Sequence, residues 1–125
     1  MEKANIWNIE GMEFPAGRRT RVMLGSNGAL KGDQFCQGYV VIYPGGGIPE
    51  HDHETVESYT ILRGKGMMEV DGEKREVKEG DFVFMSPFQK HGLYNTGEEE
   101  LHMMFVYAPS VVVDHWEQEQ NGKLK

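Results

Sequence analysis

Hydrophobic and polar residues alternate with a period of two along much of the chain. Successive side chains of a strand point to opposite faces, so this alternation predicts strands with one buried face. The first such segment places Thr20, Val22 and Leu24 on one face and Arg19, Arg21 and Met23 on the other. Further strands are expected over residues 34–43, 57–62, 67–70, 74–77, 82–85, 93–95 and 101–107. The pattern therefore predicts an all-β protein.

Turn residues separate these segments. Asp71 and Gly72 lie between two short strand segments, and an Asp-Gly pair favours the type I′ turn of a two-residue hairpin. The glycines from Gly45 to Gly47 follow the segment 34–43, but no Lys-Ser or Lys-Thr pair comes after them. We interpret them as a plain turn and not as a phosphate-binding loop. Sixteen glycines among 125 residues fit the many turns of a small barrel.

Two histidine-containing segments carry the candidate chemistry. His51 and His53 are two residues apart and share a face in a strand, and Glu57 keeps that facing if the chain stays extended. His91 adds a third imidazole from another strand. Three imidazoles and one carboxylate suit a first-row divalent cation. Four such ligands in an octahedron would leave two positions for water or a bidentate substrate.

The spacing of glycines around the first segment is specific. Gly45 precedes His51 with five residues between them, and Gly64 follows Glu57 with six between them. This arrangement resembles the first signature of the cupin superfamily, Gly-x5-His-x-His-x3-Glu-x6-Gly, at every fixed position.

Residues 80–95 resemble the second cupin signature. Gly80, His91 and Asn95 are in register, whereas the proline comes one place late at Pro87, and Phe88 stands where the family usually has glycine. The resemblance implies a small jelly-roll β-barrel that holds one divalent ion, with zinc, manganese, iron and nickel as candidates. The ligands that it implies are His51, His53, Glu57 and His91. Asn95 is not a ligand in the family.

The alternation of hydrophobic and polar residues says less about which other side chains line the pocket. Tyr59 continues the parity of Glu57 and should point inward. The last strand is apolar on both faces, so the parity leaves open whether His102 faces in or out. Tyr59 and His102 are the candidate proton carriers. Arg19 and Arg21 are expected on the wet face of an outer strand, with a role in holding a substrate carboxylate as the alternative.

Three functions are compatible with such a site. The leading one is a metal-dependent enzyme of isomerase or lyase type that acts on a small oxygen-rich anion such as a sugar acid. The alternatives are an iron-dependent dioxygenase and a non-catalytic, metal-dependent binder of a small acid such as oxalate. Oxygen consumption, or tight binding without turnover, would separate them.

Composition limits the other classes of function. The length of 125 residues is enough for one core, so we expect a single domain with a barrel at about 18–108 and a C-terminal extension at 109–125. A net charge of −7 argues against a general nucleic-acid binder. Cys36 is the only cysteine and cannot form an intrachain disulfide. No apolar stretch resembles a signal peptide or a membrane span, so the expected location is the cytoplasm.

The C-terminal extension has its own pattern. Val111 to Val113 and Trp116 are too apolar to stay in water, and the segment could continue as a strand and then form a short helix. We expect it to pack on the barrel or on a second subunit, because related barrels are often homodimers. Asp114 and His115 are interpreted as surface or interface residues.

Overall fold

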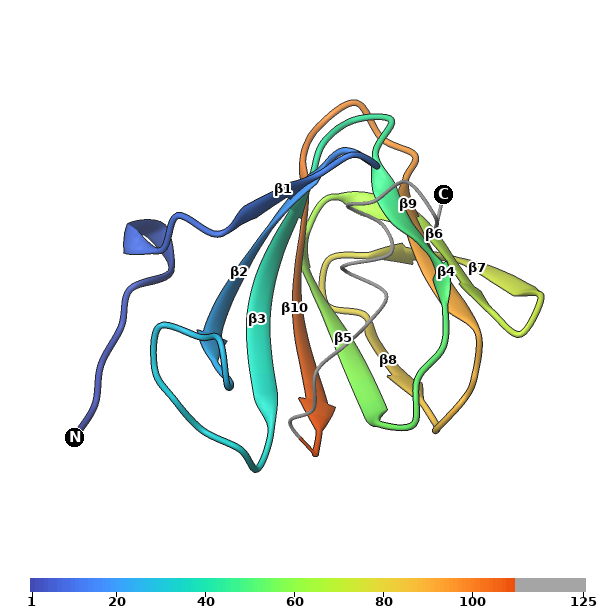
Figure 1. The fold of residues 1–125 in the computed structure, drawn as a ribbon. Helices are drawn as coiled ribbons and strands as arrows, with labels where there is room; N and C mark the ends of the chain where they lie inside the picture. The colour runs from blue at the N-terminus through green and yellow to red at the C-terminus, as the bar shows by residue number, and fades with distance from the viewer. Residues whose placement is uncertain (110–125) are drawn as a thin grey trace.

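The computed structural model describes residues 1–109, and antiparallel strands dominate them (Figure 1). In chain order the elements are η1 (Ile6–Asn8), β1 (Met12–Phe14), β2 (Arg18–Leu24), β3 (Cys36–Ile42), β4 (Gly47–His51), β5 (Val56–Arg63), β6 (Lys65–Val70), β7 (Glu73–Lys78), β8 (Phe82–Met85), β9 (His91–Asn95) and β10 (Leu101–Ala108). The expected all-β fold is confirmed. The predicted strand, helix and contacts of the C-terminal extension fall outside the described residues.

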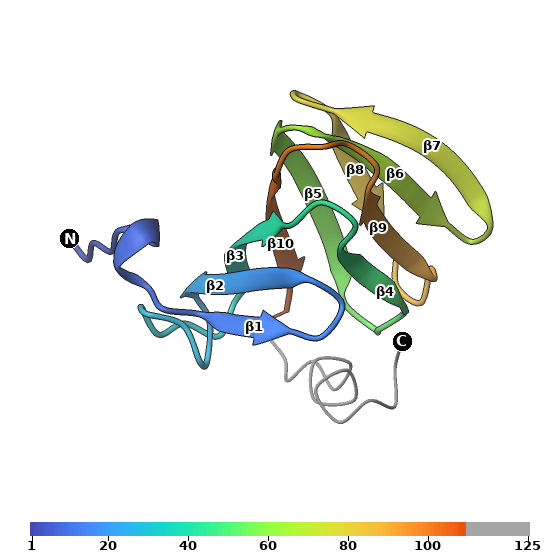
Figure 2. The same ribbon diagram turned by 90° about the horizontal axis from the view of Figure 1, so that it is seen from above.

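The strands form two antiparallel sheets. The six-stranded sheet has the order β1-β2-β3-β10-β5-β8, and the four-stranded sheet has the order β4-β9-β6-β7. Seen from above, the four-stranded sheet stands across from β3, β10 and β5 (Figure 2). Both sheets contribute buried side chains to one hydrophobic core, among them Val40, Ile42, Ile48, Ile61, Met68, Leu93, Leu101 and Met103. Within residues 1–109, no helix is long and apolar enough to cross a membrane.

The alternation in sequence matches the alternation of burial along β5. Tyr59 is buried in the core, as expected, and so is Ile61, whereas Ser58, Thr60 and Leu62 alternate with them and are partly exposed. The structure also shows which face of β10 points into the core. Met103 and Phe105 belong to the core, so His102 points to the outer face of the six-stranded sheet.

The outer face explains why β10 is apolar on both sides. The N-terminal segment crosses this face, and the Trp7 ring packs edge-on against the rings of Tyr39 at 5.3 Å and His102 at 6.4 Å. This contact helps to bury His102, whereas Met104 and Val106 on the same face are partly exposed. The sequence pattern did not predict η1 or β1, and the expected strand that carries His51 ends at that residue, as β4, instead of continuing beyond it.

The connection between β6 and β7 confirms the predicted hairpin. Val70 pairs with Glu73, so two residues form the loop. Asp71 has a φ of 48° and Gly72 a φ of 84°. Both central residues of a type I′ turn need positive φ, which aspartate tolerates and glycine adopts freely.

The turn before His91 contains the residue that departs from the family pattern. Pro87 is followed by Phe88 with a φ of 64°, and the Gln89 N–H donates to the Ser86 carbonyl at 3.2 Å. A proline followed by a left-handed residue is the arrangement of a type II turn. The Phe88 N–H also donates to the carbonyl of His53 at 2.8 Å, which ties this turn to the other histidine segment.

Replacing Phe88 with glycine is expected to raise the free energy of unfolding by up to about 1 kcal/mol, because a left-handed residue with a Cβ costs roughly 1–2 kcal/mol. The Phe88 side chain is 67% exposed, so little packing is lost. Phe88→Val should instead lower stability by about 1–2 kcal/mol, since a branched Cβ fits this region poorly. Urea denaturation of the two variants measures both effects. A glycine variant less stable than the valine variant would contradict this account of the turn.

Candidate metal centre

The four predicted ligands come from both sheets and from the chain between them. His51 is the last residue of β4 and pairs with His91, the first residue of β9. Glu57 lies on β5 in the opposite sheet, and His53 lies in the connection from β4 to β5. The expectation that one strand carries His51, His53 and Glu57 is therefore wrong. The chain leaves one sheet after residue 51 and joins the other at residue 56, so the crossing brings the side chains together.

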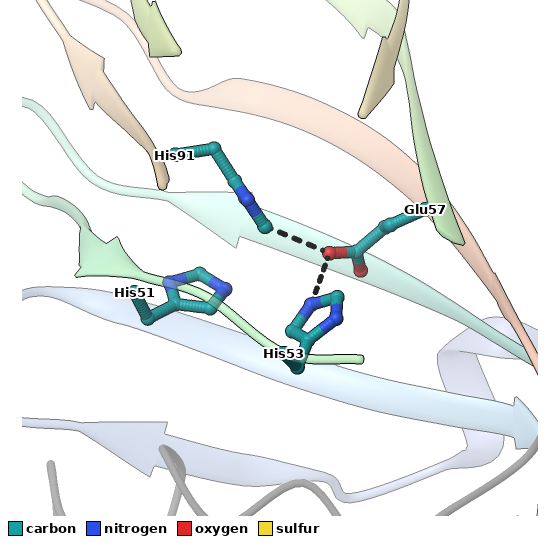
Figure 3. A group of neighbouring side chains, drawn as sticks. All are labelled: His51, His53, Glu57 and His91. Atoms are coloured by element: carbon teal, nitrogen blue, oxygen red, sulfur yellow. Dashed lines mark hydrogen bonds and ion pairs between the residues drawn. The ribbon is translucent and has the colours of Figure 1, made fainter. Parts of the chain in front are cut away.

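The four side chains converge on one point (Figure 3). Their ligand atoms all lie within 4.8 Å of one another. Oε1 of Glu57 is 3.0 Å from Nε2 of His53 and 3.0 Å from Nε2 of His91. The ring of His51 lies 4.3 Å from that of His91, measured between centroids. His53 is partly exposed, whereas the other three residues are buried.

Backbone carbonyls fix the orientation of all three imidazoles. Each Nδ1 lies within hydrogen-bond distance of a carbonyl oxygen two residues away along the chain: His51 of Pro49 at 2.7 Å, His53 of Thr55 at 3.2 Å, and His91 of Gln89 at 2.8 Å. A carbonyl only accepts, so each Nδ1 carries the proton and donates. In a neutral ring the lone pair is then on Nε2; a proton on Nε2 of His53 or His91 would donate to Oε1 of Glu57, and a metal ion would take the place of that proton. This is the arrangement that orients histidines in metal sites.

Burial and the contacts within the cluster shift the pKa values of the site residues in opposite directions. Burial beside His91 lowers the pKa of His51 to about 3, so this imidazole stays neutral. Burial also acts to lower the pKa of His53, but the hydrogen bond and negative charge of Glu57 outweigh it and raise that pKa. For Glu57 the cost of burial is exceeded by its bonds to His53 and His91, so its pKa is lowered. The carboxylate is therefore ionised at neutral pH.

These residues fit a divalent first-row cation. Imidazole nitrogens with a free lone pair and an ionised carboxylate are the donors that such ions prefer. Three of the four side chains are buried, and each imidazole is oriented by a hydrogen bond between its Nδ1 and a backbone carbonyl. The group His51, His53, Glu57 and His91 could hold one metal ion.

The family comparison agrees with the site and the fold. The Cupin_2 family, described as Cupin domain, matches residues 38–107, which is more than half of the chain. The chain belongs to the cupin family. The match contains all four side chains of the candidate metal centre.

Individual relatives match about half of this cupin. An oxalate-binding protein of Thermotoga maritima is 34% identical over 64 residues, which cover 50% of this chain and 53% of that protein. An uncharacterized protein of Methanocaldococcus jannaschii is 42% identical over 60 residues, covering 47% and 48%. Each match spans about half the length of the curated relative. The crystal structure of a predicted oxalate decarboxylase from Thermotoga maritima superposes with a TM-score of 0.75 at 21% identity, covering 86% of this chain and 99% of that one. That likeness shows the fold.

Of the two candidate proton carriers in this cupin, only Tyr59 is close to the cluster. Its side chain is 2% exposed, and its ring lies 5.9 Å from that of His91. His102 is on the other side of the sheet, where Nδ1 contacts the Tyr39 hydroxyl at 2.7 Å and Nε2 contacts Glu100 at 3.2 Å. Its placement does not support a role as a base at the metal centre.

The arginines singled out in the sequence also lie outside the site. Arg19 bonds to Glu13 at 3.0 Å, and Arg21 bonds to the carbonyl of Ile9 at 2.9 Å. Their neighbour Arg18, which the sequence analysis missed, lines a cavity with His51 and Glu57. The signal was available, because Arg18 has the parity of Thr20 and hence of the buried face.

Cys36 is buried in the core and bonds to the hydroxyl of Tyr107, whose ring lies 6.1 Å from that of His53. Burial raises the pKa of the Cys36 thiol, which keeps it protonated at neutral pH. A buried, protonated thiol is a poor nucleophile.

Metal affinity of this cupin is expected to fall as the pH falls below 6.5, the ordinary pKa of histidine. The pKa of His53 is raised, so below that pH the metal must displace a proton from His53. His51, with a pKa of about 3, contributes no proton in this range. The logarithm of the affinity should rise with pH with a slope of at least about one between about pH 5 and 6.5. Calorimetric titration in two buffers counts the protons released, and a slope of zero would contradict the prediction.

Proposed function

We propose that this cupin is a metal-dependent enzyme that moves a proton on a small oxygen-rich anion, such as a sugar acid or another short carboxylic acid. The observation that carries the proposal is the convergence of three oriented Nε2 atoms and an ionised carboxylate beside a buried cavity. The 34% identity with an oxalate-binding protein supports a small acid as the ligand.

The residues of the site suggest which of them would bind the ion and which would limit access of water. His51, His53, Glu57 and His91 would hold the ion. When bound, the ion would supply a Lewis acid that stabilises negative charge on substrate oxygens. Ile48, Met103 and Phe105 form an apolar wall that limits water at the substrate.

Tyr59 is the proposed proton carrier, because it lines the same cavity as His51 and Glu57. As the phenolate, its oxygen would accept a proton from substrate carbon, and the phenol so formed would return a proton, which is general acid–base catalysis. A Tyr59→Phe variant keeps the ring and its packing but removes the hydroxyl. It should retain metal and lose about 10²–10⁴-fold in rate, the usual contribution of such a group.

The test begins with metal analysis of protein purified without a chelating tag. The metal-loaded protein is then incubated in D₂O with sugar acids and short hydroxy acids, and exchange at the carbon beside the carboxylate is followed by NMR. Exchange that is lost in Tyr59→Phe and kept in the exposed-ring variant Tyr94→Phe supports the proposal. Oxygen consumption by an iron-loaded protein would favour a dioxygenase instead. Binding without exchange or turnover would leave a metal-dependent binding protein.

Two broader expectations stay predictions. The homodimer is tested by sedimentation of the purified chain, where a single species of 14.2 kDa would exclude it. The cytoplasmic location is tested by fractionation of cells that express the protein.

A further inference from the structure

His53 is the one candidate ligand of the four that does not lie on a strand. His51, Glu57 and His91 belong to β4, β5 and β9, whereas His53 lies in the connection from β4 to β5. It is also the one of the four that is partly exposed. The hydrogen bonds of a sheet fix the backbone of a strand residue. The ring of His53 therefore depends on other contacts for its position.

Contacts from three parts of the chain hold His53. Its carbonyl accepts from the Phe88 N–H at 2.8 Å, and its Nε2 lies 3.0 Å from Oε1 of Glu57. Its Nδ1 lies 2.6 Å from the side-chain hydroxyl of Thr55 and 3.2 Å from the carbonyl oxygen of the same residue. The contact with the Thr55 hydroxyl is the shortest of these.

The hydroxyl of Thr55 is shielded from water, because this residue is only 1% exposed. Buried polar groups are almost always hydrogen-bonded, and little water is present here to compete for the bond. A hydroxyl can donate or accept, whereas the carbonyl beside it only accepts. With the proton on Nδ1 of His53, both oxygens of Thr55 can accept it.

Two tautomers of the neutral His53 ring compete. In one, Nδ1–H donates to Thr55; in the other, Nε2–H donates to the carboxylate of Glu57. Only the first tautomer leaves the Nε2 lone pair free for an ion. Without the hydroxyl, the Nδ1 side would keep only the longer contact with the carbonyl at 3.2 Å. The hydroxyl therefore favours the tautomer that can bind a metal.

We propose that Thr55 is a positioning residue of the candidate metal centre. Its hydroxyl accepts the Nδ1 proton of His53, orients the ring and keeps Nε2 available to the ion. Groups that hold the far nitrogen of a ligand histidine usually change metal affinity 10–100-fold when they are removed, so we expect about that loss here. The inference deepens the proposed function and rests on it, since it needs the cluster to bind an ion.

The test compares Thr55→Val, which keeps the branched shape without the hydroxyl, with Thr55→Ser, which keeps the hydroxyl. Zinc affinity is measured by competition with a chelator. Thr55→Val should bind zinc about 10–100-fold more weakly than the wild type, and Thr55→Ser should bind it as the wild type does. Thr60→Val is the matched control, because Thr60 is partly exposed on the outer face of β5. It should leave zinc affinity unchanged.

A second measurement separates positioning from a structural role. NMR of the ring nitrogens of the metal-free protein, at an alkaline pH where the imidazoles are neutral, reports the tautomer of each histidine. Thr55→Val should shift His53 toward the Nε2–H form, by up to about tenfold in the ratio of tautomers for the loss of one hydrogen bond. His51 and His91 should keep the tautomers that they have in the wild type.

The outcomes separate this inference from the proposed function. Zinc affinity that is equal in wild type and Thr55→Val overturns the role of Thr55 and leaves the proposed function standing. Equal weakening in Thr55→Val and Thr55→Ser, or weaker binding with an unchanged His53 tautomer, makes Thr55 a structural residue and also overturns the inference. A wild type that binds neither zinc nor manganese overturns both. If Thr55→Val does not fold, Thr55→Ala takes its place, because it differs from Thr55→Ser only by the hydroxyl oxygen.

Discussion

Replacing His91 with alanine is expected to lower metal affinity by more than about a hundredfold, because loss of a partner behind a ligand already costs about 10–100-fold. His91 is 1% exposed, and its Nε2 lies 3.0 Å from the shared oxygen of Glu57. The variant removes one of the four candidate ligands, so only three side chains remain to bind the ion. Metal content after dialysis against a weak chelator, together with titration of the metal-free protein, measures the loss.

The control for this experiment is His102→Ala. His102 is also a buried histidine, but it contacts Tyr39 and Glu100 on the outer face of the six-stranded sheet. Its removal should leave metal content unchanged. Equal metal loss in both variants would show that general destabilisation, and not loss of a ligand, explains the result for His91.

Leu93→Ala is expected to lower the free energy of unfolding by about 2–5 kcal/mol, the usual cost of truncating a buried leucine. Leu93 is 0% exposed and lies in the core between the two sheets, on the strand that also carries His91. The cavity left behind would loosen β9 where it carries the candidate ligand His91. Urea denaturation of the metal-free protein isolates the packing effect from the effect of the metal.

Phe84→Ala is the matched control, since Phe84 is a large apolar residue exposed on the edge strand β8. It should change stability by less than about 0.5 kcal/mol, as surface substitutions usually do. A loss below about 1 kcal/mol for Leu93→Ala would contradict its place at the centre of the core.

Local rules were enough to predict several elements from the sequence. The Asp71-Gly72 turn followed from backbone preferences that depend on two residues alone. The inward facing of Tyr59 followed from the period of a strand. The candidate ligand set was implied by the resemblance to the cupin signatures, and the four side chains do converge.

Other features depend on packing that no local pattern contains. The crossing from β4 to β5 is set by which sheet each strand joins, so parity could not place His53 relative to Glu57. The burial of His102 on the outer face of β10 involves Trp7, which is nearly a hundred residues away in the chain. Arg18 had the parity of a buried residue, but a charged side chain is normally assigned to the surface because burial is costly.

The ligands of the candidate metal centre belong to opposite sheets, with His51 and His91 on one and Glu57 on the other. An ion bound there would act as a removable cross-link through the core. A ligand that binds only the native state stabilises it by about 2.7 kcal/mol when its concentration is a hundredfold above the dissociation constant. Resistance to proteases would then rise and fall with the free metal concentration. The lifetime of this protein in a cell would therefore depend on metal supply.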